Sequence, residues 1–351
     1  LGIMTQYRRE PTLAISLFGP EGFCLKKAIK KSKSGDGIFG KVKKHDKTII
    51  TDFSVDGSFA AYTGIFDKDF VKNTLSKRDD IDFIEDPIAV KATYAVNLIN
   101  LLEKRTVQSN APFNLDRIDQ KDFPLDGNYN FPTNAGSGVN IYVVDTVEQV
   151  LEEVFALIAH QLMIMVKVLN QDGQGSSLTV TAGLSFVIDQ HKKSSNKNTI
   201  INLSLAGAFS QAINTMVSQC SNAGIHVVVS AGDGSGDACK ASPASAPQAI
   251  TVGATEKSSN NITSFTNTGS CVKIFAPGRD IIAAGAFLAD SLSQASGTSQ
   301  ACPHVAGTVA LIISKKGNMS PSSMVNELIT SSTKNILKNA TPNIFLRVPS
   351  P

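Results

Sequence analysis

Apolar runs rich in β-branched residues alternate with helical stretches along this chain after about residue 139. The runs occupy 139–144, 163–169, 199–205 and 225–229. Stretches that suit helices lie at 178–190, 211–223 and 305–313. Strands that are apolar along their whole length are buried on both faces, which is typical of a parallel sheet between two helical layers. The sequence therefore predicts a three-layer α/β domain.

Composition narrows the class of protein. The chain has 351 residues, of which 42% are hydrophobic and 18% charged, with a net charge of +3. These values are typical of a soluble globular protein, and the charge is too small to indicate nucleic-acid binding. No apolar run approaches the ~18 residues that a membrane span needs. We expect neither nucleic acid nor a membrane as a partner.

The string from Ser296 to Gly307 reads Ser-Gly-Thr-Ser-Gln-Ala-Cys-Pro-His-Val-Ala-Gly. It presents Ser299 in a turn of small residues, just before an apolar run long enough for a buried helix. Backbone N–H groups and the dipole at a helix N-terminus stabilise a developing oxyanion. The pattern suits a nucleophilic serine, and the alternative is a Ser or Thr cap before an ordinary core helix.

This string closely resembles the nucleophile motif of the subtilisin-like serine proteases, Gly-Thr-Ser-Met-Ala-x-Pro-His-Val-Ala-Gly. The resemblance makes Ser299 the nucleophile that forms an acyl-enzyme with a peptide or protein substrate, and it places His304 in the packed start of the helix. The segments Asn114–Asp119 and Pro124–Gly127 resemble the first part of mature fungal enzymes of the proteinase K type. The expected fold is a subtilisin-like three-layer parallel-sheet domain.

The family's orienting carboxylate ends the first strand, in the pattern apolar-apolar-Asp-Ser/Thr-Gly. Val143-Val144-Asp145-Thr146 fits this pattern, so the resemblance assigns the role to Asp145. Open α/β sheets place their sites at such strand ends. Val147 replaces the glycine of the pattern.

The family's general base lies in the string His-Gly-Thr-His-Val-Ala-Gly, several dozen residues after the aspartate. This sequence contains no such string. The run Met163–Leu169 resembles a later strand of the family, so the segment that carries the histidine is expected to be deleted after about residue 147. Its helix normally packs beside the nucleophile helix, and we expect its loss to leave a shallow gap with exposed apolar surface beside Ser299.

The other histidines have ordinary explanations. His160 falls at the start of a strand pattern, where we expect a surface residue. His45 and His191 lie in polar stretches that predict loops, and His226 begins an apolar strand. None of them resembles the missing motif.

The resemblance also implies an oxyanion hole and a peptide groove. The family has Ala-Ala-Gly-Asn after the fourth strand, and here Asp233 stands at the place of the asparagine donor. The string Ser204-Leu205-Ala206-Gly207 resembles the strand edge that pairs with an extended peptide. Ala231 and Gly232 match a wall of the specificity pocket.

Residues 1–95 differ in character from the rest. A hairpin is predicted over 52–66 by alternating residues around Asp56-Gly57, followed by a short helix at 67–77 and a strand at 81–87. The order resembles the small α/β, ferredoxin-like, inhibitor-like propeptide of the family. The expected organisation is a propeptide domain (1–95), a linker (96–112) and a peptidase domain (113–351), with the segment near Val90 to Tyr94 lying in the groove beside Ser204–Gly207.

Five cysteines without metal-like spacing argue against zinc, and Cys239 and Cys271 could form a disulfide in an oxidising compartment. Cys302 is expected to be a small buried residue. Four glycosylation sequons begin at Asn202, Asn261, Asn318 and Asn339; Asn202 is expected to be buried, and Asn261 is the expected glycan site. We expect no cofactor. Calcium sites are common in the family, so calcium binding stays open, although no acidic loop here matches one convincingly.

Two functions remain open at this point. One is a secreted or vacuolar subtilisin-family endopeptidase zymogen, although no signal peptide is visible. The other is a pseudo-protease, a non-catalytic peptide-binding or inhibitory module, which the missing histidine and Asp233 favour. A mis-spliced transcript or faulty gene model that lost the histidine segment is a third explanation.

Overall fold

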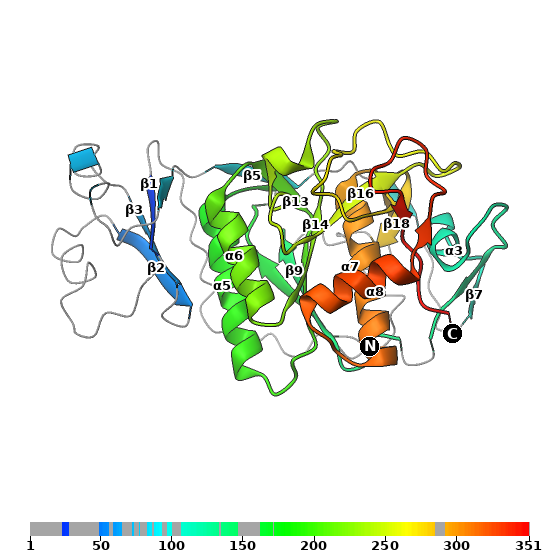
Figure 1. Ribbon diagram of the computed structural model, residues 1–351, viewed down its shortest axis with the longest axis horizontal. Helices are drawn as coiled ribbons and strands as arrows, with labels where there is room; N and C mark the ends of the chain where they lie inside the picture. The colour runs from blue at the N-terminus through cyan, green and yellow to red at the C-terminus, as the bar shows by residue number, and fades with distance from the viewer. Residues whose placement is uncertain are drawn as a thin grey trace.

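An eight-stranded sheet forms the middle layer of the region after residue 139 (Figure 1). The computed structural model describes residues 107–350 except 133–134, 147–161, 171 and 285–291, together with 23–27, 49–55, 59–64, 72–73, 77, 83–85, 88–92 and 97–99. The sheet order is β10-β9-β12-β14-β16-β17-β21-β20, and every neighbouring pair is parallel except β20 and β21. The strands are β9 (Asn140–Asp145), β10 (Leu162–Lys167), β12 (Thr199–Leu203), β14 (His226–Ser230), β16 (Ile250–Thr255), β17 (Ile274–Pro277), β20 (Thr333–Lys334) and β21 (Ile344–Phe345).

Helices cover both faces of this sheet, because successive residues of a strand point to opposite faces. In β9, Ile141 and Val143 belong to the core that contains α7 and α8, whereas Tyr142 and Val144 belong to the core that contains α5 and α6. The helices are α5 (Ser177–Lys193), α6 (Gln211–Asn222), α7 (Thr298–Lys316) and α8 (Pro321–Ser331). The predicted three-layer α/β architecture is confirmed.

Local sequence explains where these helices begin. Ser176 and Thr179 exchange side-chain-to-backbone hydrogen bonds at the start of α5, which is a capping box. Ser210 and Ser320 accept backbone N–H bonds at the starts of α6 and α8. The residue before α7 is Gly297, which has no side chain to serve as a cap.

Helix α7 is buried along nearly its whole length. Every residue from Thr298 to Ile313 is buried, including the polar ones at its start. A helix that is enclosed on all sides belongs to the core. The expected gap with exposed apolar surface beside Ser299 is therefore wrong, since that residue is only 2% exposed.

Smaller sheets surround the central one. A four-stranded sheet has the order β11-β5-β13-β15, formed by β11 (Gln174–Ser176), β5 (Ala89–Ala92), β13 (Leu205–Ala208) and β15 (Ala241–Ser242). Two others join β18 (Ile281–Ala284), β19 (Leu292–Ala295) and β6 (Asn97–Ile99), and β7 (Val107–Ser109) with β8 (Asn128–Asn130). The short helices are α3 (Phe113–Asp119) and η2 (Ala238–Lys240).

The N-terminal residues form a separate four-stranded sheet, drawn in blue beside α5 and α6 in Figure 1. Its order is β2-β3-β1-β4, with β1 (Phe23–Lys27), β2 (Ile49–Val55), β3 (Phe59–Gly64) and β4 (Phe83–Glu85). The predicted hairpin is confirmed by the antiparallel pairing of β2 with β3, and the predicted strand at 81–87 by β4. Most of the predicted helix at 67–77 lies outside the described residues.

Two details differ from the sequence predictions. The run 199–205 is divided at Ser204 into β12 and β13, which belong to different sheets. The stretch expected to be a linker, 96–112, contains the short strands β6 and β7. The domain boundaries remain predictions.

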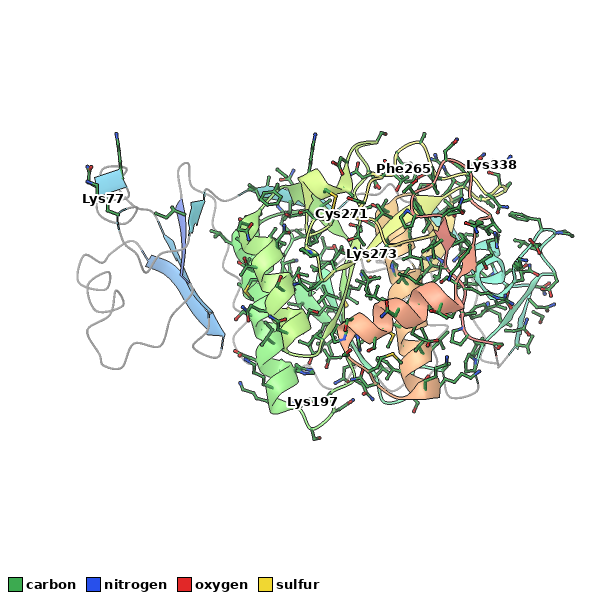
Figure 2. The ribbon with its side chains drawn as sticks, viewed as in Figure 1. Lys77, Lys197, Phe265, Cys271, Lys273 and Lys338 are labelled. Carbon is green, nitrogen blue, oxygen red and sulfur yellow. A yellow bond between two sulfur atoms is a disulfide. The ribbon has the colours of Figure 1, made fainter. Side chains whose placement is uncertain are left out.

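Side chains fill the space between the layers, and lysines such as Lys197 and Lys338 project from the surface (Figure 2).

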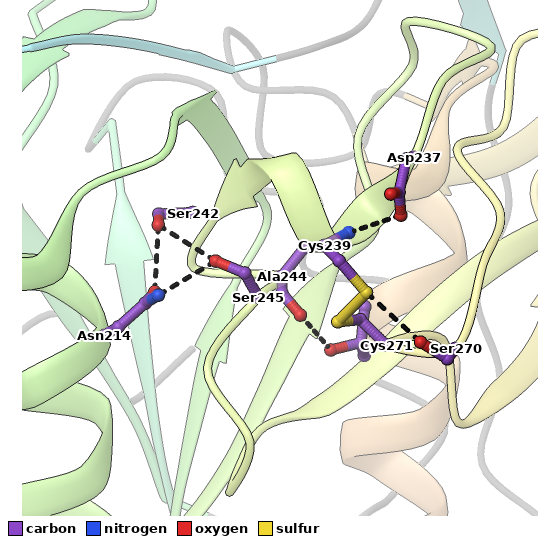
Figure 3. The surroundings of a disulfide bond; sticks show 9 residues. Asn214, Asp237, Cys239, Ser242, Ala244, Ser245, Ser270 and Cys271 are labelled. Carbon is purple, nitrogen blue, oxygen red and sulfur yellow. Dashed lines mark hydrogen bonds between the residues drawn. A yellow bond between two sulfur atoms is a disulfide. The ribbon is translucent and has the colours of Figure 1, made fainter.

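A disulfide joins Cys239 to Cys271, as predicted, with a Cα–Cα distance of 5.3 Å (Figure 3). It connects η2 to the loop before β17, and Asp237 accepts a hydrogen bond of 2.9 Å from the Cys239 N–H. The two cysteines are 32 residues apart in the sequence, and closing a loop of that length restricts the unfolded chain and so stabilises the fold.

Candidate active site

Ser299 is the second residue of α7. Its hydroxyl donates a hydrogen bond of 2.7 Å to the backbone carbonyl of Ser204. The Ser204 hydroxyl donates in turn to the Ser299 carbonyl at 3.0 Å, and accepts from Asn202 Nδ2 at 2.9 Å. These reciprocal bonds join the start of α7 to the point where β12 ends and β13 begins.

Asp145 is the last residue of β9, the strand next to β12. Its carboxylate accepts a 2.7 Å hydrogen bond from the Thr146 N–H, and the residue is 7% exposed. Burial raises the pKa of this carboxyl to about 7, and the Thr146 bond lowers it by less. A carboxylate with so high a pKa changes its charge near neutral pH.

Cys302 lies in the first turns of α7, three residues after Ser299, and is close to Asp145. Its sulfur contacts the Leu203 carbonyl at 4.0 Å, and the residue is fully buried, as predicted. Burial, together with the nearby Asp145 charge, raises the pKa of this thiol. Ser299, Ser204 and Asp145 therefore lie at the same carboxyl edge of the central sheet, which is the arrangement that the sequence predicts. Their catalytic roles remain predictions.

Asp233 contacts the first residue of α7, Thr298. Its Oδ1 accepts a hydrogen bond of 2.8 Å from the Thr298 N–H, and the Thr298 hydroxyl accepts from the Gly232 N–H at 3.0 Å. Gly232 has a φ of +95°, and a Cβ there would lie 2.6 Å from Asn267 Nδ2, so glycine is required. Asn267 Nδ2 also donates to the Ala231 carbonyl at 2.9 Å. Asp233 thus serves as a cap for α7 that accepts, rather than donates, a hydrogen bond.

The described histidines form hydrogen bonds with groups other than Ser299 and Asp145. His304 Nδ1 donates to the Gln300 carbonyl at 2.7 Å and its Nε2 accepts from Asn114 Nδ2 at 3.0 Å, so the ring is a neutral part of the core. His226 Nε2 bonds to Asn318 Oδ1 at 2.8 Å. The prediction of a loop for His191 is wrong: it is a buried residue in the last turn of α5, bonded to Thr199 and Ala223. His45 and His160 lie outside the described residues.

Four buried polar atoms near this edge have no hydrogen-bond partner in the part of the chain that the structure describes. They are Thr146 Oγ1, Asn202 Oδ1 and both amide atoms of Gln300. Thr146 follows Asp145, and Gln300 follows Ser299. Buried polar groups in folded proteins are nearly always bonded, so such a group of exceptions calls for an explanation.

Strand β5 fills the predicted peptide groove. It lies between β11 and β13, antiparallel to both, and pairs Ala92, Lys91 and Val90 with Leu205, Ala206 and Gly207. The predicted placement of residues 90–94 beside 204–207 is confirmed as far as Ala92, and 93–96 lie outside the described residues. Val90 is fully buried and belongs to the same core as Leu205, which makes it the anchor of the strand.

A glycine is needed where the two strands meet. A Cβ at Gly207 would lie 2.8 Å from both the Ala89 carbonyl oxygen and Val90 Cγ1. The string Ser204–Gly207 therefore allows a strand to lie close beside it. The sequence predictions gave Asn202, Thr298 and Asn267 no role at this site, because their roles depend on contacts with residues distant in sequence.

No metal site or membrane span was found in the part of the chain that the structure describes. No group of three or more His, Cys, Asp and Glu side chains is arranged to hold an ion there. No helix among these residues has the length and apolar character to cross a bilayer.

Comparison with known proteins identifies the family. Residues 148–346 match a model described as the subtilase family. The extracellular serine proteinase of Thermus sp. (strain Rt41A) is 36% identical over 290 aligned positions, covering 69% of this chain and 67% of the relative. The cuticle-degrading serine protease of Arthrobotrys oligospora (strain ATCC 24927 / CBS 115.81 / DSM 1491) is 32% identical over 314 positions, covering 78% of this chain and 73% of the relative.

A solved structure gives the same result. The crystal structure of a cold adapted subtilisin-like serine proteinase matches with a TM-score of 0.63 and 30% identity, covering 69% of this chain and all of the other. The fold is subtilisin-like, and this chain belongs to the subtilase family, whose relatives here are named as serine proteases.

Proposed function

We propose that this chain is a subtilase that holds an extended peptide strand but does not hydrolyse it in the form that its sequence gives. The seated strand β5 carries the first half of the proposal. It forms backbone hydrogen-bonded pairs on both sides and buries Val90 in the core. Peptides held by strand addition gain affinity from such backbone bonds and specificity from side-chain pockets.

The missing general base carries the second half. A serine nucleophile needs a base to take its proton, a carboxylate to orient that base, and donors for the oxyanion. In this proposal Ser299 is the nucleophile and Asp145 the orienting carboxylate, whereas Asp233 stands at the oxyanion position as an acceptor. In a subtilisin mutant series, loss of the serine or histidine alone lowers turnover by about 10⁶-fold.

Two observations support the loss of a segment. Only 69% of this 351-residue chain falls within the 290 positions aligned with the Thermus relative, so several dozen of these positions contain no residue of this chain. The unpartnered buried atoms of Thr146 and Gln300 flank Asp145 and Ser299, where a missing segment would leave polar groups without partners.

The N-terminal region is assigned by the same proposal. Residues 1–95 form a propeptide whose last strand, β5, stays in the groove of the peptidase domain at 113–351, joined by the segment 96–112. A chain without the base does not cut itself, so its own propeptide remains its first peptide partner. An outside peptide or protein enters the groove only after β5 leaves.

The proposed location is the secretory pathway, ending outside the cell or in a vacuole. The Cys239–Cys271 disulfide favours an oxidising compartment. The Thermus relative is named as extracellular, which supports the same location.

The test compares the full chain with Ser299→Ala after purification from a host that lacks related proteases. We expect two full-length bands of equal mobility, background hydrolysis of peptide anilides, and no labelling by a serine-directed phosphonate that labels an active subtilase in parallel. A shorter band or labelling that Ser299→Ala abolishes would show that the parent chain is active.

A second measurement separates the pseudo-protease from a faulty sequence. Sequencing of the transcript across codons 140–170 is expected to show no segment encoding His-Gly-Thr-His. Recovery of that segment would restore the endopeptidase zymogen as the function of the complete protein.

A further inference from the structure

We propose that Asn261 and Asn339 carry N-linked oligosaccharides on one face of the protein. Both asparagines begin an Asn-x-Thr sequon, Asn261-Ile262-Thr263 and Asn339-Ala340-Thr341. The inference relies on the secretory location proposed above. It concerns a surface remote in sequence from Ser299 and Asp145.

Exposure distinguishes these two asparagines from Asn202. Asn261 and Asn339 are both exposed, and no hydrogen bond to either side-chain amide is found among the described residues. Asn202 is 2% exposed, and its amide donates to Ser204 beside the nucleophile helix. A sugar on Asn202 would have to occupy the core, so a folded molecule does not carry one.

Asn318 is exposed but its amide is already used at both ends. Its Oδ1 accepts from His226 Nε2 at 2.8 Å, and its Nδ2 donates to the Lys197 carbonyl at 2.9 Å. A sugar on Nδ2 would crowd the contact with Lys197. We therefore expect Asn318 to remain unmodified.

The two proposed sites lie on neighbouring backbone segments. Asn261 and Lys338 form a parallel bridge, and the Lys338 N–H donates to the Asn260 carbonyl at 2.8 Å. Lys338, which directly precedes Asn339, is labelled at the upper surface of Figure 2. Two glycans here would cover one continuous patch formed by residues 260–262 and 338–340.

The modification forms one bond and breaks another. Asn Nδ2 bonds to the first sugar carbon of a lipid-diphosphate-linked oligosaccharide supplied by the secretory pathway. The bond from that carbon to the diphosphate oxygen breaks, the lipid diphosphate leaves, and Nδ2 loses one proton. No oxidation or reduction takes place.

The test uses the full chain secreted from a yeast host behind a signal peptide of that host. Digestion with an endoglycosidase that leaves one N-acetylglucosamine marks each modified asparagine for peptide mass spectrometry. The parent chain is expected to carry two marks, Asn261→Gln and Asn339→Gln one each, and the double variant none. A parent chain with fewer than two marks, or a marked double variant, would overturn the proposal.

Three control variants keep the result independent of folding. Thr341→Ser retains the second sequon and is expected to keep its glycan, whereas Thr341→Val removes it with little change in shape. Ser320→Asp removes the Asn318 sequon but keeps a side chain that can cap α8, so the number of marks should not change. This test does not depend on proteolytic activity, so its failure would leave the hydrolysis result unaffected.

Discussion

The two sides of the candidate active site differ in how completely their polar groups are bonded. On the nucleophile side, Ser299 and Ser204 exchange hydrogen bonds and Asp233 caps the helix. On the carboxylate side, the Asp145 carboxylate accepts one hydrogen bond within the described part of the chain, from Thr146, and Thr146 Oγ1 has no partner. The nucleophile side is fixed by the core helix α7, so it stays ordered without any catalytic role. Among the described residues the carboxylate side lacks such support, so the buried Asp145 carboxylate is retained there at a cost in stability.

The largest effect that this comparison predicts is a gain in stability from Asp145→Asn at high pH. The pKa of Asp145 is raised from 3.8 to about 7 in the folded protein, so the folded state binds more protons than the unfolded state between these values. Stability therefore falls as pH rises through this range. The loss above pH 7 is about 4 kcal/mol at 1.36 kcal/mol per pKa unit.

The amide that Asp145→Asn introduces resembles the protonated carboxyl and can still accept the Thr146 bond. Urea unfolding should show nearly equal stability for parent and variant at pH 4, and a variant more stable by about 4 kcal/mol at pH 8. Asp189→Asn, at an exposed position of α5, is the control for the change of side-chain chemistry alone. Parallel curves for parent and Asp145→Asn would mean that the carboxylate has a partner that compensates its burial.

A smaller effect of opposite sign is predicted on the nucleophile side, at His304. Burial lowers the pKa of this ring to about 4 from an ordinary value of 6.5, so the unfolded state binds more protons between these values. Stability should fall by about 3 kcal/mol as pH drops from 6.5 to 4. The His304→Gln variant removes this group, and its unfolding free energy should lose correspondingly less over the same range. An acid limb of equal steepness in both proteins would assign the loss to other groups, such as the buried His226.

The sequence predicted the central architecture because the signals are local. Apolar runs of strand length and the string around Ser299 each occupy a few consecutive residues, and the structure places them as a parallel sheet and a buried helix. Even the Cys239–Cys271 pairing followed from the loop-like context of the two residues.

The failures have a common physical origin. The sequence could not show that α7 stays covered at Ser299, because burial depends on neighbours that are distant in the chain. It could not show that the run 199–205 divides at Ser204, where one strand leaves the central sheet and the next pairs with β5. His191 appeared to lie in a loop because it is surrounded by polar residues, yet it closes α5 and contacts Thr199 and Ala223. In each case tertiary contacts overrode the local pattern.

The smallest predicted effect concerns Asp233, whose carboxylate caps α7 by accepting from Thr298 N–H. Loss of a side-chain cap typically costs about 1 kcal/mol, so Asp233→Ala should lower the free energy of unfolding by roughly that amount. Asp233→Asn keeps an oxygen acceptor and loses only the favourable charge at the helix N-terminus, worth about 0.3–1 kcal/mol and weakened by salt. The expected order of stability is therefore the parent chain, then Asp233→Asn, then Asp233→Ala, with the difference between the first two shrinking as salt is added. If Asp233 contributed only to an oxyanion hole and not to the helix, all three proteins would unfold at the same urea concentration.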